Sequence, residues 1–558
     1  MATYYASAAV SSGGAGTIGD PWPLRTALAN ASQTAGDTLY LRGGTYTGRF
    51  KSTLTGGTVR PYPGESVKFD GNKTTTLSGD IASGTGTINV GSTEGMFGGL
   101  VVTIDDEDIQ VASVVDADTF TAVRGWNGTA AAAHTAGATV THNDSYILNI
   151  LGGDNTTYRD LEIYSSSTFR DVAANRVASG RGSGIVITGA SDGNFLINNI
   201  IHDCANGIFI GSDSSNTTVY GNVVYNNGIM DGPGDPAGQG IYAENASGYS
   251  RVYRNVIANN YNGNGQFGGD SGPYIGGDHQ YNVFANSGAP AGTLEVNYLG
   301  RAEGQALSVT NNHFFQHHNN SGGSASLFGY GEAMSALTLN NNYMVGGVSS
   351  CIFSNIDTIT GSGNHFFLND NDFGDAQMFY TLALLPTGTF NNNTYHKAQG
   401  RSCFGKQGVG YFGFSTWKTD SGFDANSTET NVNMPDTVVV IPNEYETGRA
   451  NIVIYATSNP ATIDVDLSTT GLLDGQAFSI KNSVDYLGTE VLTGVYDSAD
   501  PIITITLTDA DGVATPTGGS ITPATTVPDF AALVVVPGDL SLLSACTISN
   551  ASFTGVRF

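Results

Sequence analysis

Residues 231–303 bring together carboxylates, tyrosines, arginines and a histidine, which are side chains able to bind and cleave a sugar chain. Carboxyl groups act as general acid and base in glycosidic bond cleavage, and aromatic rings stack on sugar faces. The alternative interpretation is a solvated flank of an acidic protein. The acid and base candidates are Asp231, Asp235, Glu244, Asp270 and Glu295, and the candidate substrate-binding residues are Tyr242, Tyr274, His279, Tyr298 and Arg301.

Short alternating segments must position these side chains. "GIVITG", "GIFIG" and "GIYAEN" have the period-2 pattern of β-strands, in which successive side chains point to opposite faces. Tyr242 and Glu244 are therefore expected to point outward. The residues expected to point inward are Ile185, Ile187, Ile208, Ile210, Ile241 and Ala243.

Asparagine-centred segments recur at irregular intervals along the same part of the chain. A repeat of variable period predicts a solenoid in which loops of different length separate equivalent strands. The asparagine at each corner could donate its side-chain amide to the next coil and form a ladder. The repeated positions are Asn199, Asn222, Asn255, Asn282, Asn312, Asn342 and Asn364.

Composition and charge restrict the function classes. The chain has 558 residues with 75 glycines, 13% charged residues and a net charge of −27, which favours short strands and tight turns. Nucleic-acid binding through phosphates needs clustered cations, so we expect none. No apolar run spans a bilayer and the N-terminal segment lacks a secretion signal pattern, so we expect neither membrane insertion nor classical secretion. The four dispersed cysteines predict neither a zinc site nor a disulfide framework.

The N-terminal segment carries a family resemblance. "TYYASAAVSSGGAGTIGDPWPLRTALANASQTAGDTLYLRGGTYTG" resembles the N-terminal cap of right-handed parallel β-helix proteins of the pectate-lyase-like superfamily. The resemblance implies an all-β fold, a right-handed parallel β-helix solenoid with a small inserted β domain and a C-terminal β-sandwich. It implies no particular activity, because that superfamily holds lyases, hydrolases and noncatalytic adhesins.

Composition shifts predict the domain boundaries. Residues 1–75 form the cap and first coils, 76–142 an inserted small β-barrel or sandwich, and 143–430 the parallel β-helix. Residues 431–540 form a C-terminal β-sandwich and 541–558 a tail. The stretch "IDDEDIQVASV" followed by "FTAVRGWNGTAAAAHTAGATV" resembles a module of tailed-phage tail and virion proteins. Its acidic run, residues 105–108, is expected to be a solvated strand edge.

Two further chemistries were weighed against hydrolysis. A lyase that uses lysine as its base is disfavoured, because no lysine occurs between Lys73 and Lys397. A lyase could instead use His279 and Tyr281 as base and acid, with Arg254 and Arg301 neutralising a uronate. We expect no metal and no cofactor at the site, although "NDNDFGD" offers oxygen ligands that could hold calcium, from Asp370, Asp372 and Asp375.

Three functions remain open from the sequence. The leading hypothesis is a phage tailspike or tail-fibre-like virion protein that binds host surface polysaccharide, with or without cleavage. The alternatives are an exported bacterial polysaccharide lyase or glycoside hydrolase, and a noncatalytic structural or decoration virion protein. The sequence does not decide whether the protein is an enzyme. The expected partners are polysaccharide, a homotrimer and other tail proteins, and the expected location is the virion tail or the extracellular space.

Overall fold

The computed structural model of the protein describes residues 1–538 except 144, 171–180, 231–234, 270–273, 294, 302–305, 318–322, 332, 369–376, 382–385, 397–403 and 407–409. The chain divides into two compact units. One comprises residues 1–434 together with 515–524, and the other comprises residues 435–514 together with those that follow residue 524.

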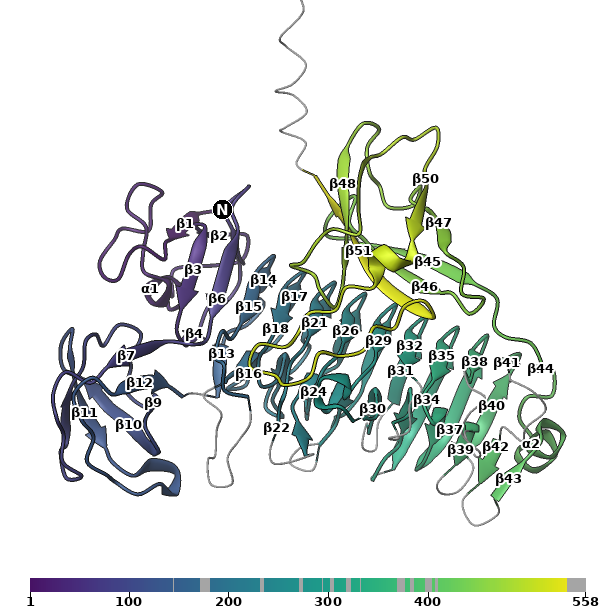
Figure 1. Ribbon diagram of the computed structural model, residues 1–558, viewed down its shortest axis with the longest axis horizontal. Helices are drawn as coiled ribbons and strands as arrows, with labels where there is room; N and C mark the ends of the chain where they lie inside the picture. Colours follow the sequence, from purple (N-terminus) through teal and green to yellow (C-terminus); the bar gives the residue numbers. More distant parts are fainter. Residues whose placement is uncertain are drawn as a thin grey trace, which may run out of the picture. The chain divides into compact units, whose positions relative to one another are not determined.

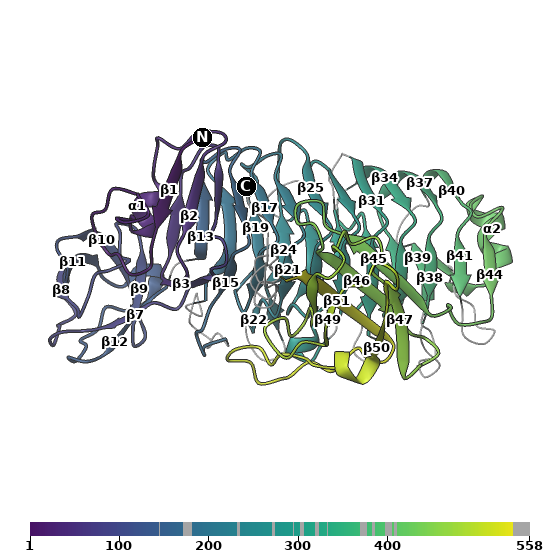
Figure 2. The same cartoon turned by 90° about the horizontal axis from the view of Figure 1, so that it is seen from above.

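The first unit is a parallel β-helix in which three twelve-stranded sheets run along one solenoid (Figure 1). Each coil contributes one strand to each sheet in turn, and equivalent strands of successive coils pair in parallel (Figure 2). At the end of sheet 1 the last strand, β43, folds back on β42 and pairs with it antiparallel. Short apolar strands separated by turns therefore build the fold that the alternation predicts.

The strands of sheet 1 carry the candidate site. They are β4 (Phe50–Ser52), β13 (Tyr146–Leu151), β16 (Ser183–Thr188), β19 (Ile208–Ile210), β24 (Gln239–Ala243), β27 (Gly263–Phe267), β30 (Tyr298–Gly300), β33 (Leu327–Phe328), β36 (Ser349–Phe353), β39 (Gln377–Thr381), β42 (Phe404–Lys406) and β43 (Gly410–Phe412).

Sheet 2 follows sheet 1 within each coil. Its strands are β1 (Thr3–Ala6), β2 (Thr38–Leu41), β5 (Thr58–Pro61), β14 (Thr157–Arg159), β17 (Phe195–Ile197), β20 (Thr218–Tyr220), β25 (Ser250–Tyr253), β28 (Gly277–Gln280), β31 (Ala306–Thr310), β34 (Met334–Asn340), β37 (Ile356–Ser362) and β40 (Thr387–Asn391).

Sheet 3 closes each coil. Its strands are β3 (Gly44–Thr47), β6 (Val67–Asp70), β15 (Glu162–Tyr164), β18 (Ile200–His202), β21 (Val223–Tyr225), β26 (Val256–Ala258), β29 (Val283–Ala285), β32 (His313–Gln316), β35 (Tyr343–Gly346), β38 (His365–Phe367), β41 (Thr394–His396) and β44 (Thr428–Thr430).

The predicted asparagine ladder is confirmed at the turn between sheets 2 and 3. Asn199 Nδ2 donates to Asn222 Oδ1 at 3.0 Å, and every later asparagine of the repeat bonds the next, ending at Asn393. The residue before a ladder asparagine adopts a left-handed conformation, as at Asn198 with φ 54° and Asn311 with φ 57°. Asparagine tolerates that conformation, which explains the repeated "NN" pairs.

The inward faces of the three sheets share one apolar core. The isoleucines and Ala243 that the alternation placed inward have no exposed surface. Among the described residues of this unit, the α-helices are α1 (Leu24–Leu28) near the N-terminus and α2 (Phe414–Ser421) near the last coil. Trp417 of α2 donates its indole N–H to the buried carboxylate of Asp424 at 2.8 Å, and Tyr395 of the last coils donates to the same group at 2.8 Å. This shared carboxylate ties α2 to the end of the solenoid.

A small antiparallel domain is inserted after β6. Its six-stranded sheet contains β7 (Thr74–Thr76), β12 (Thr139–His142), β9 (Val101–Ile104), β10 (Glu107–Val114), β11 (Thr119–Val123) and β8 (Thr87–Asn89), with a 3₁₀ turn η1 (Trp126–Gly128), and it has its own apolar cluster. The expectation of a solvated acidic edge is wrong for Glu107, which is 1% exposed. Arg124 donates two hydrogen bonds to this carboxylate and the His134 ring contacts it at 2.9 Å, so the charge is buried as a paired group.

The second unit contains two antiparallel sheets around one apolar cluster. The five-stranded sheet contains β45 (Thr437–Pro442), β46 (Ala450–Tyr455), β51 (Phe530–Pro537), β48 (Ala477–Asn482) and β49 (Leu492–Val495), and the two-stranded sheet contains β47 (Thr462–Asp466) and β50 (Ile502–Thr506), followed by η3 (Leu507–Ala510).

Residues 515–524 belong with the β-helix, although the sequence analysis placed them in the sandwich. The Arg170 and Arg181 guanidinium groups both donate to the carbonyl of Thr517, at 3.1 and 2.9 Å, and the Thr517 amide donates to Asp203 at 2.7 Å. The tail at 541–558 lies outside the described residues. Across the part of the chain that is described, no helix has the length and apolarity to cross a membrane.

Candidate active site on sheet 1

The outward face of sheet 1 carries an aromatic and amide surface on three consecutive coils. Phe209, Tyr242 and Gln266 are in register on β19, β24 and β27, and all three are partly exposed. The rings of Phe209 and Tyr242 meet edge to face with centroids 5.3 Å apart. The Gln239 amide donates to Gln266 at 3.0 Å, which fixes the second amide of the surface. Rings and amides in this arrangement can stack on sugars and bond their hydroxyls.

Glu244 and Arg301 continue the backbone hydrogen bonding of sheet 1 just beyond this surface. Their backbone amides bond the preceding coils at Ile210 and Phe267, and Gly268 lies between them in the register. Glu244 is 4% exposed and accepts a hydrogen bond from the Tyr242 hydroxyl. The Arg301 guanidinium donates to the carbonyl of Tyr330 at 3.1 Å. Both predicted site residues therefore lie at sheet 1, where they support the surface through their neighbours.

A second pair of predicted carboxylates lies on the loops that lead into sheet 1. Asp235 is exposed beside the hairpin of β22 (Ile229–Met230) and β23 (Pro236–Ala237), which precedes β24. Glu295 is half-buried on the loop that precedes β30 and follows η2 (Ala289–Ala291). Burial raises the pKa of Glu295, and repulsion from the Asp235 carboxylate raises it further, against a hydrogen bond from Thr293. The pKa of the Glu295 carboxyl group thus lies above its ordinary value.

The loop holds Glu295 in place through its backbone. The Ser287 hydroxyl donates to the carbonyl of Glu295 at 2.7 Å, and the Gln316 amide donates to the same oxygen at 3.3 Å. Gly288 has φ 76°, and a Cβ there would lie 2.0 Å from the carbonyl oxygen of Thr293. Only glycine fits this turn, so the residue types of the loop fix where the carboxyl group lies.

Three predicted substrate-binding residues are in the core and not on the surface. Tyr274, His279 and Tyr298 have no exposed surface. His279 occupies the inward register position between Val252 and Val309 of sheet 2, and its ring nitrogens contact Tyr274 Oη at 2.9 Å and Tyr298 Oη at 2.6 Å. These three residues are therefore not on the surface where the substrate-binding prediction needs them, and His279 points inward because its register neighbours are core valines. Burial lowers the pKa of His279 to about 3.

The same burial removes His279 as the base of a lyase with Tyr281 and Arg254. Those two residues stack on each other at the turn between sheets 2 and 3, where the Arg254 guanidinium lies 4.7 Å from the Tyr281 ring centroid. This turn belongs to the asparagine ladder and not to sheet 1.

Asp231 and Asp270 lie outside the described residues, as do Asp370, Asp372 and Asp375 of the calcium hypothesis. Within the described ranges no three His, Cys, Asp or Glu residues are arranged to hold a metal ion.

Sequence reasoning missed the amide part of the surface. Phe209 could have been found, because the alternation that places Ile208 and Ile210 inward also places Phe209 outward. Gln239 and Gln266 carried no such signal, since the segment "GNGQFGG" has glycines where its inward residues should be. Gly265 occupies one of those inward positions, next to Tyr298 of the following coil.

Comparison with known families agrees with this architecture. The model of the right-handed β-helix region matches residues 125–287, and the same three sheets continue the coils before and after that range. The protein is thus a right-handed parallel β-helix protein. A search among curated proteins found no match.

Similar solved structures have low sequence identity and low TM-scores. The tailspike of Acinetobacter baumannii bacteriophage AP22, in complex with a capsular saccharide, is 12% identical with a TM-score of 0.27 over 90% of this chain and 88% of that one. A pectate lyase is 14% identical with a TM-score of 0.34 over 78% and 88%, and a lacto-N-biosidase from Eubacterium ramulus is 10% identical with a TM-score of 0.34 over 77% and 68%. Likeness at this level carries no argument about function.

Proposed function

We propose that the protein binds a polysaccharide along the outward face of sheet 1 and cleaves it by hydrolysis. The observation that carries the proposal is the pair Asp235 and Glu295, in which burial and the neighbouring carboxylate raise the pKa of Glu295. Two carboxyl groups that differ in environment can divide the roles of acid and base. The pair lies on the loops entering β24 and β30, and the ring and amide surface of Tyr242 and Gln266 lies on β24 and β27.

In the proposed reaction Glu295 donates its proton to the glycosidic oxygen as the bond to the leaving sugar breaks. Asp235 accepts a proton from the attacking water, so the hydroxide equivalent adds to the sugar carbon and the proton balance is kept. The two loops enter strands that are two coils apart, which corresponds to about 10 Å along the solenoid. In inverting glycosidases the two carboxyl groups are about 6.5–9.5 Å apart, which leaves room for a water molecule, whereas in retaining ones they are about 5 Å apart. Because the two strands are two coils apart and not one, we propose inversion at the sugar carbon.

We also propose that the protein is a phage tail protein, and the inserted domain supports this part of the hypothesis. Residues 74–142 form a separate sheet with its own core, as expected of an accessory module. A virion tail or extracellular location, a homotrimer and contacts with other tail proteins follow from that hypothesis. Light scattering of the purified protein would test the trimer, and a monomer at micromolar concentration would contradict it.

Cleavage is tested with a panel of neutral and acidic bacterial polysaccharides, measuring new reducing ends and the absorbance of unsaturated uronates together. We expect reducing ends without the chromophore, and a loss of rate of about 10²- to 10⁴-fold in Glu295→Gln. The matched control is Glu490→Gln, which removes an exposed carboxylate of the second unit that pairs with Lys481. The chromophore would contradict hydrolysis, and unchanged activity in Glu295→Gln would contradict the assignment of the acid.

Binding is tested separately, because a noncatalytic decoration protein would give no product. Tyr242→Ala removes a ring from the proposed surface, whereas Tyr253→Ala removes a partly exposed tyrosine of sheet 2 whose hydroxyl bonds Asp278 at 2.8 Å. We expect Tyr242→Ala to weaken binding of the cleaved polysaccharide about tenfold. Equal weakening by both variants would contradict sheet 1 as the binding face. Absence of both binding and cleavage across the panel would favour the structural alternative.

A further inference from the structure

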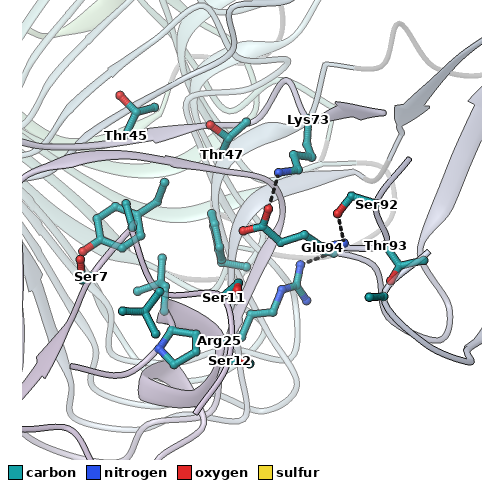
Figure 3. Close-up of a pocket in the computed structure, with 18 residues that line it drawn as sticks. Ser7, Ser11, Ser12, Arg25, Thr45, Thr47, Lys73, Ser92, Thr93 and Glu94 are labelled. Atoms are coloured by element: carbon teal, nitrogen blue, oxygen red, sulfur yellow. Dashed lines mark hydrogen bonds and ion pairs between the residues drawn. The ribbon is translucent and has the colours of Figure 1, made fainter. Parts of the chain in front are cut away.

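A second concave site lies far along the solenoid from the proposed active site, between the first coils and the inserted domain. This cavity, of about 650 Å³, is formed by the loop after β1, by β3 and α1 and by the loop 91–95 of the inserted domain. Figure 3 shows the side chains of Ser7, Thr45 and Thr47 on one side of the cavity and those of Ser92 and Thr93 on the other. All these segments belong to the same compact unit.

The wall of the cavity is rich in hydroxyl groups that the protein leaves unused. Ser11, Ser12, Thr45 and Thr47 line it, and their hydroxyls make no hydrogen bond to any of the described residues. Ser11, Ser12 and Thr45 are exposed and Thr47 is partly exposed. A set of free hydroxyls on a concave wall matches a ligand that itself carries several hydroxyls, because each can donate to and accept from the other.

Two cations line the same cavity. The Arg25 guanidinium bonds the carbonyls of Arg49 and Gly95 through Nη2 alone, while its Nε and Nη1 groups make no hydrogen bond to the described residues. Lys73 Nζ pairs with Glu94 at 3.1 Å, and the Glu94 side chain is 53% exposed. Arginine presents planar paired donors that suit a carboxylate, so the unused edge of Arg25 is available to an anion.

The surroundings add positive charge, which is unusual in a chain of net charge −27. The Arg25 guanidinium lies 5.1 Å from the Phe97 ring centroid and Lys51 Nζ lies 5.8 Å from the same centroid. His142 is fully buried next to Gly95, and neither ring nitrogen has a hydrogen-bond partner among the described residues. Burial lowers the pKa of His142 to about 3, with further lowering by Arg49, Arg25 and Lys73. Three cations thus act on the ring that lies behind the cavity.

We propose that this cavity is a second binding site, separate from sheet 1, which takes one acidic sugar unit with its carboxylate on Arg25 and Lys73 and its hydroxyls on the serines and threonines. Neutral sugars lack the charge, and simple inorganic anions lack the hydroxyls that the wall can bond. The cavity would hold the protein to an acidic polysaccharide at a point remote from the cleaved bond.

The proposal is tested by isothermal titration calorimetry with methyl glucuronide. Methyl glucoside tests the hydroxyl groups without the charge, and sodium sulfate tests the charge without the hydroxyl groups. We expect methyl glucuronide to bind at least tenfold more tightly than either. Ala8→Trp fills the cavity from an exposed wall position, and Ala9→Trp adds the same ring at the next exposed residue, which does not line the cavity. Ala8→Trp should abolish binding, and Ala9→Trp should leave it unchanged. Lys73→Gln should weaken binding several-fold.

Thermal unfolding of each variant shows whether it is folded. Tyr242→Ala should bind methyl glucuronide with the same affinity as the unmodified protein, because Tyr242 does not line the cavity. The cavity proposal can therefore be tested even if the sheet 1 proposal is wrong. Binding lost in Tyr242→Ala but kept in Ala8→Trp would overturn the proposal. Equal affinity for methyl glucoside, or sulfate binding as tight as that of methyl glucuronide, would also overturn it. Unchanged affinity in both Ala8→Trp and Lys73→Gln would do the same.

Discussion

Two groups of polar side chains from one stretch of sequence have opposite surroundings in the molecule. Tyr274, His279 and Tyr298 form a hydrogen-bonded group inside the solenoid, whereas Asp235 and Glu295 lie on loops at the edge of sheet 1. The first group satisfies its polar atoms with one another and leaves none for a ligand. In the second group, burial and repulsion from Asp235 raise the pKa of Glu295. We therefore place the proposed function on the second group, whose interactions the fold leaves incomplete.

The largest effect expected from this comparison is on stability. His279→Leu would leave the buried hydroxyls of Tyr274 and Tyr298 without their partner, which should lower the free energy of unfolding by about 2–4 kcal/mol. Glu295→Gln should change it by less than about 0.5 kcal/mol, because a half-buried loop position tolerates the substitution. Chemical denaturation measures both values. A variant without both hydroxyls and the histidine, Tyr274→Phe with Tyr298→Phe and His279→Leu, should recover part of the loss.

If His279→Leu were as stable as the unmodified protein, the buried group would not contribute and the contrast between the two regions would fail.

Acid should destabilise the core before it affects the loops. Burial lowers the pKa of His142, His279 and His313 to about 3, below the ordinary value of 6.5. The unfolded chain therefore binds more protons between pH 6.5 and 3, so stability is full above pH 6.5 and falls as pH decreases. Each histidine contributes up to about 1.4 kcal/mol per pH unit in that window.

Thermal unfolding measured from pH 7 to pH 4 tests this dependence of stability on pH. His279→Leu should make the dependence weaker by the contribution of one histidine. A midpoint that does not change with pH over this range would contradict neutral burial of the three rings.

A smaller effect sharpens the assignment of the loop pair. Asp235→Asn removes the negative charge that faces Glu295, so the pKa of Glu295 should decrease while remaining above its ordinary value because burial is the larger cause. Carbon NMR of the labelled glutamate carboxyl groups, with Glu295→Gln to assign the signal, measures this shift. The same pKa in both proteins would mean that the two carboxylates do not interact.

The smallest effect concerns the amide surface. Gln266→Ala removes one side chain that bonds Gln239 at 3.0 Å and is partly exposed on β27. We expect polysaccharide affinity to decrease about fivefold with no change in unfolding temperature, because one neutral hydrogen bond contributes about 1 kcal/mol. Gln280→Ala, a partly exposed glutamine of sheet 2, is the matched control. An equal decrease in the control would contradict a contact specific to sheet 1.

The fold was predictable from the sequence because its repeating elements are local. Each strand is a short alternating run and each ladder position is an asparagine, so Asn222 and Ile241 could be placed from their neighbours in sequence. The site was only partly predictable, because its residues come from loops whose shape depends on other coils. Asp235 and Glu295 are predicted from residue type alone, and the positions of their loops depend on turns that no local pattern describes.

His279 shows why the remaining assignment failed. The segment "GGDHQ" has too few apolar residues to display alternation, so the sequence predicts substrate binding by the histidine and does not show that it is buried. Its inward position is set by pairing with Val252 and Val309, which lie on other coils. A polar residue can occupy such a position when two tyrosine hydroxyls of the core complete its hydrogen bonds.

The asparagine ladder also bears on how such a protein changes length in evolution. Asn222 and Asn255 are 33 residues apart and occupy the same corner of successive coils. The backbone and side-chain amides of Asn222 both donate hydrogen bonds to the side-chain oxygen of Asn255. Deleting or duplicating the segment between them would join two equivalent positions and require no new backbone conformation. Whole coils can therefore be gained or lost as units, and the face of sheet 1 would lengthen or shorten by one strand each time.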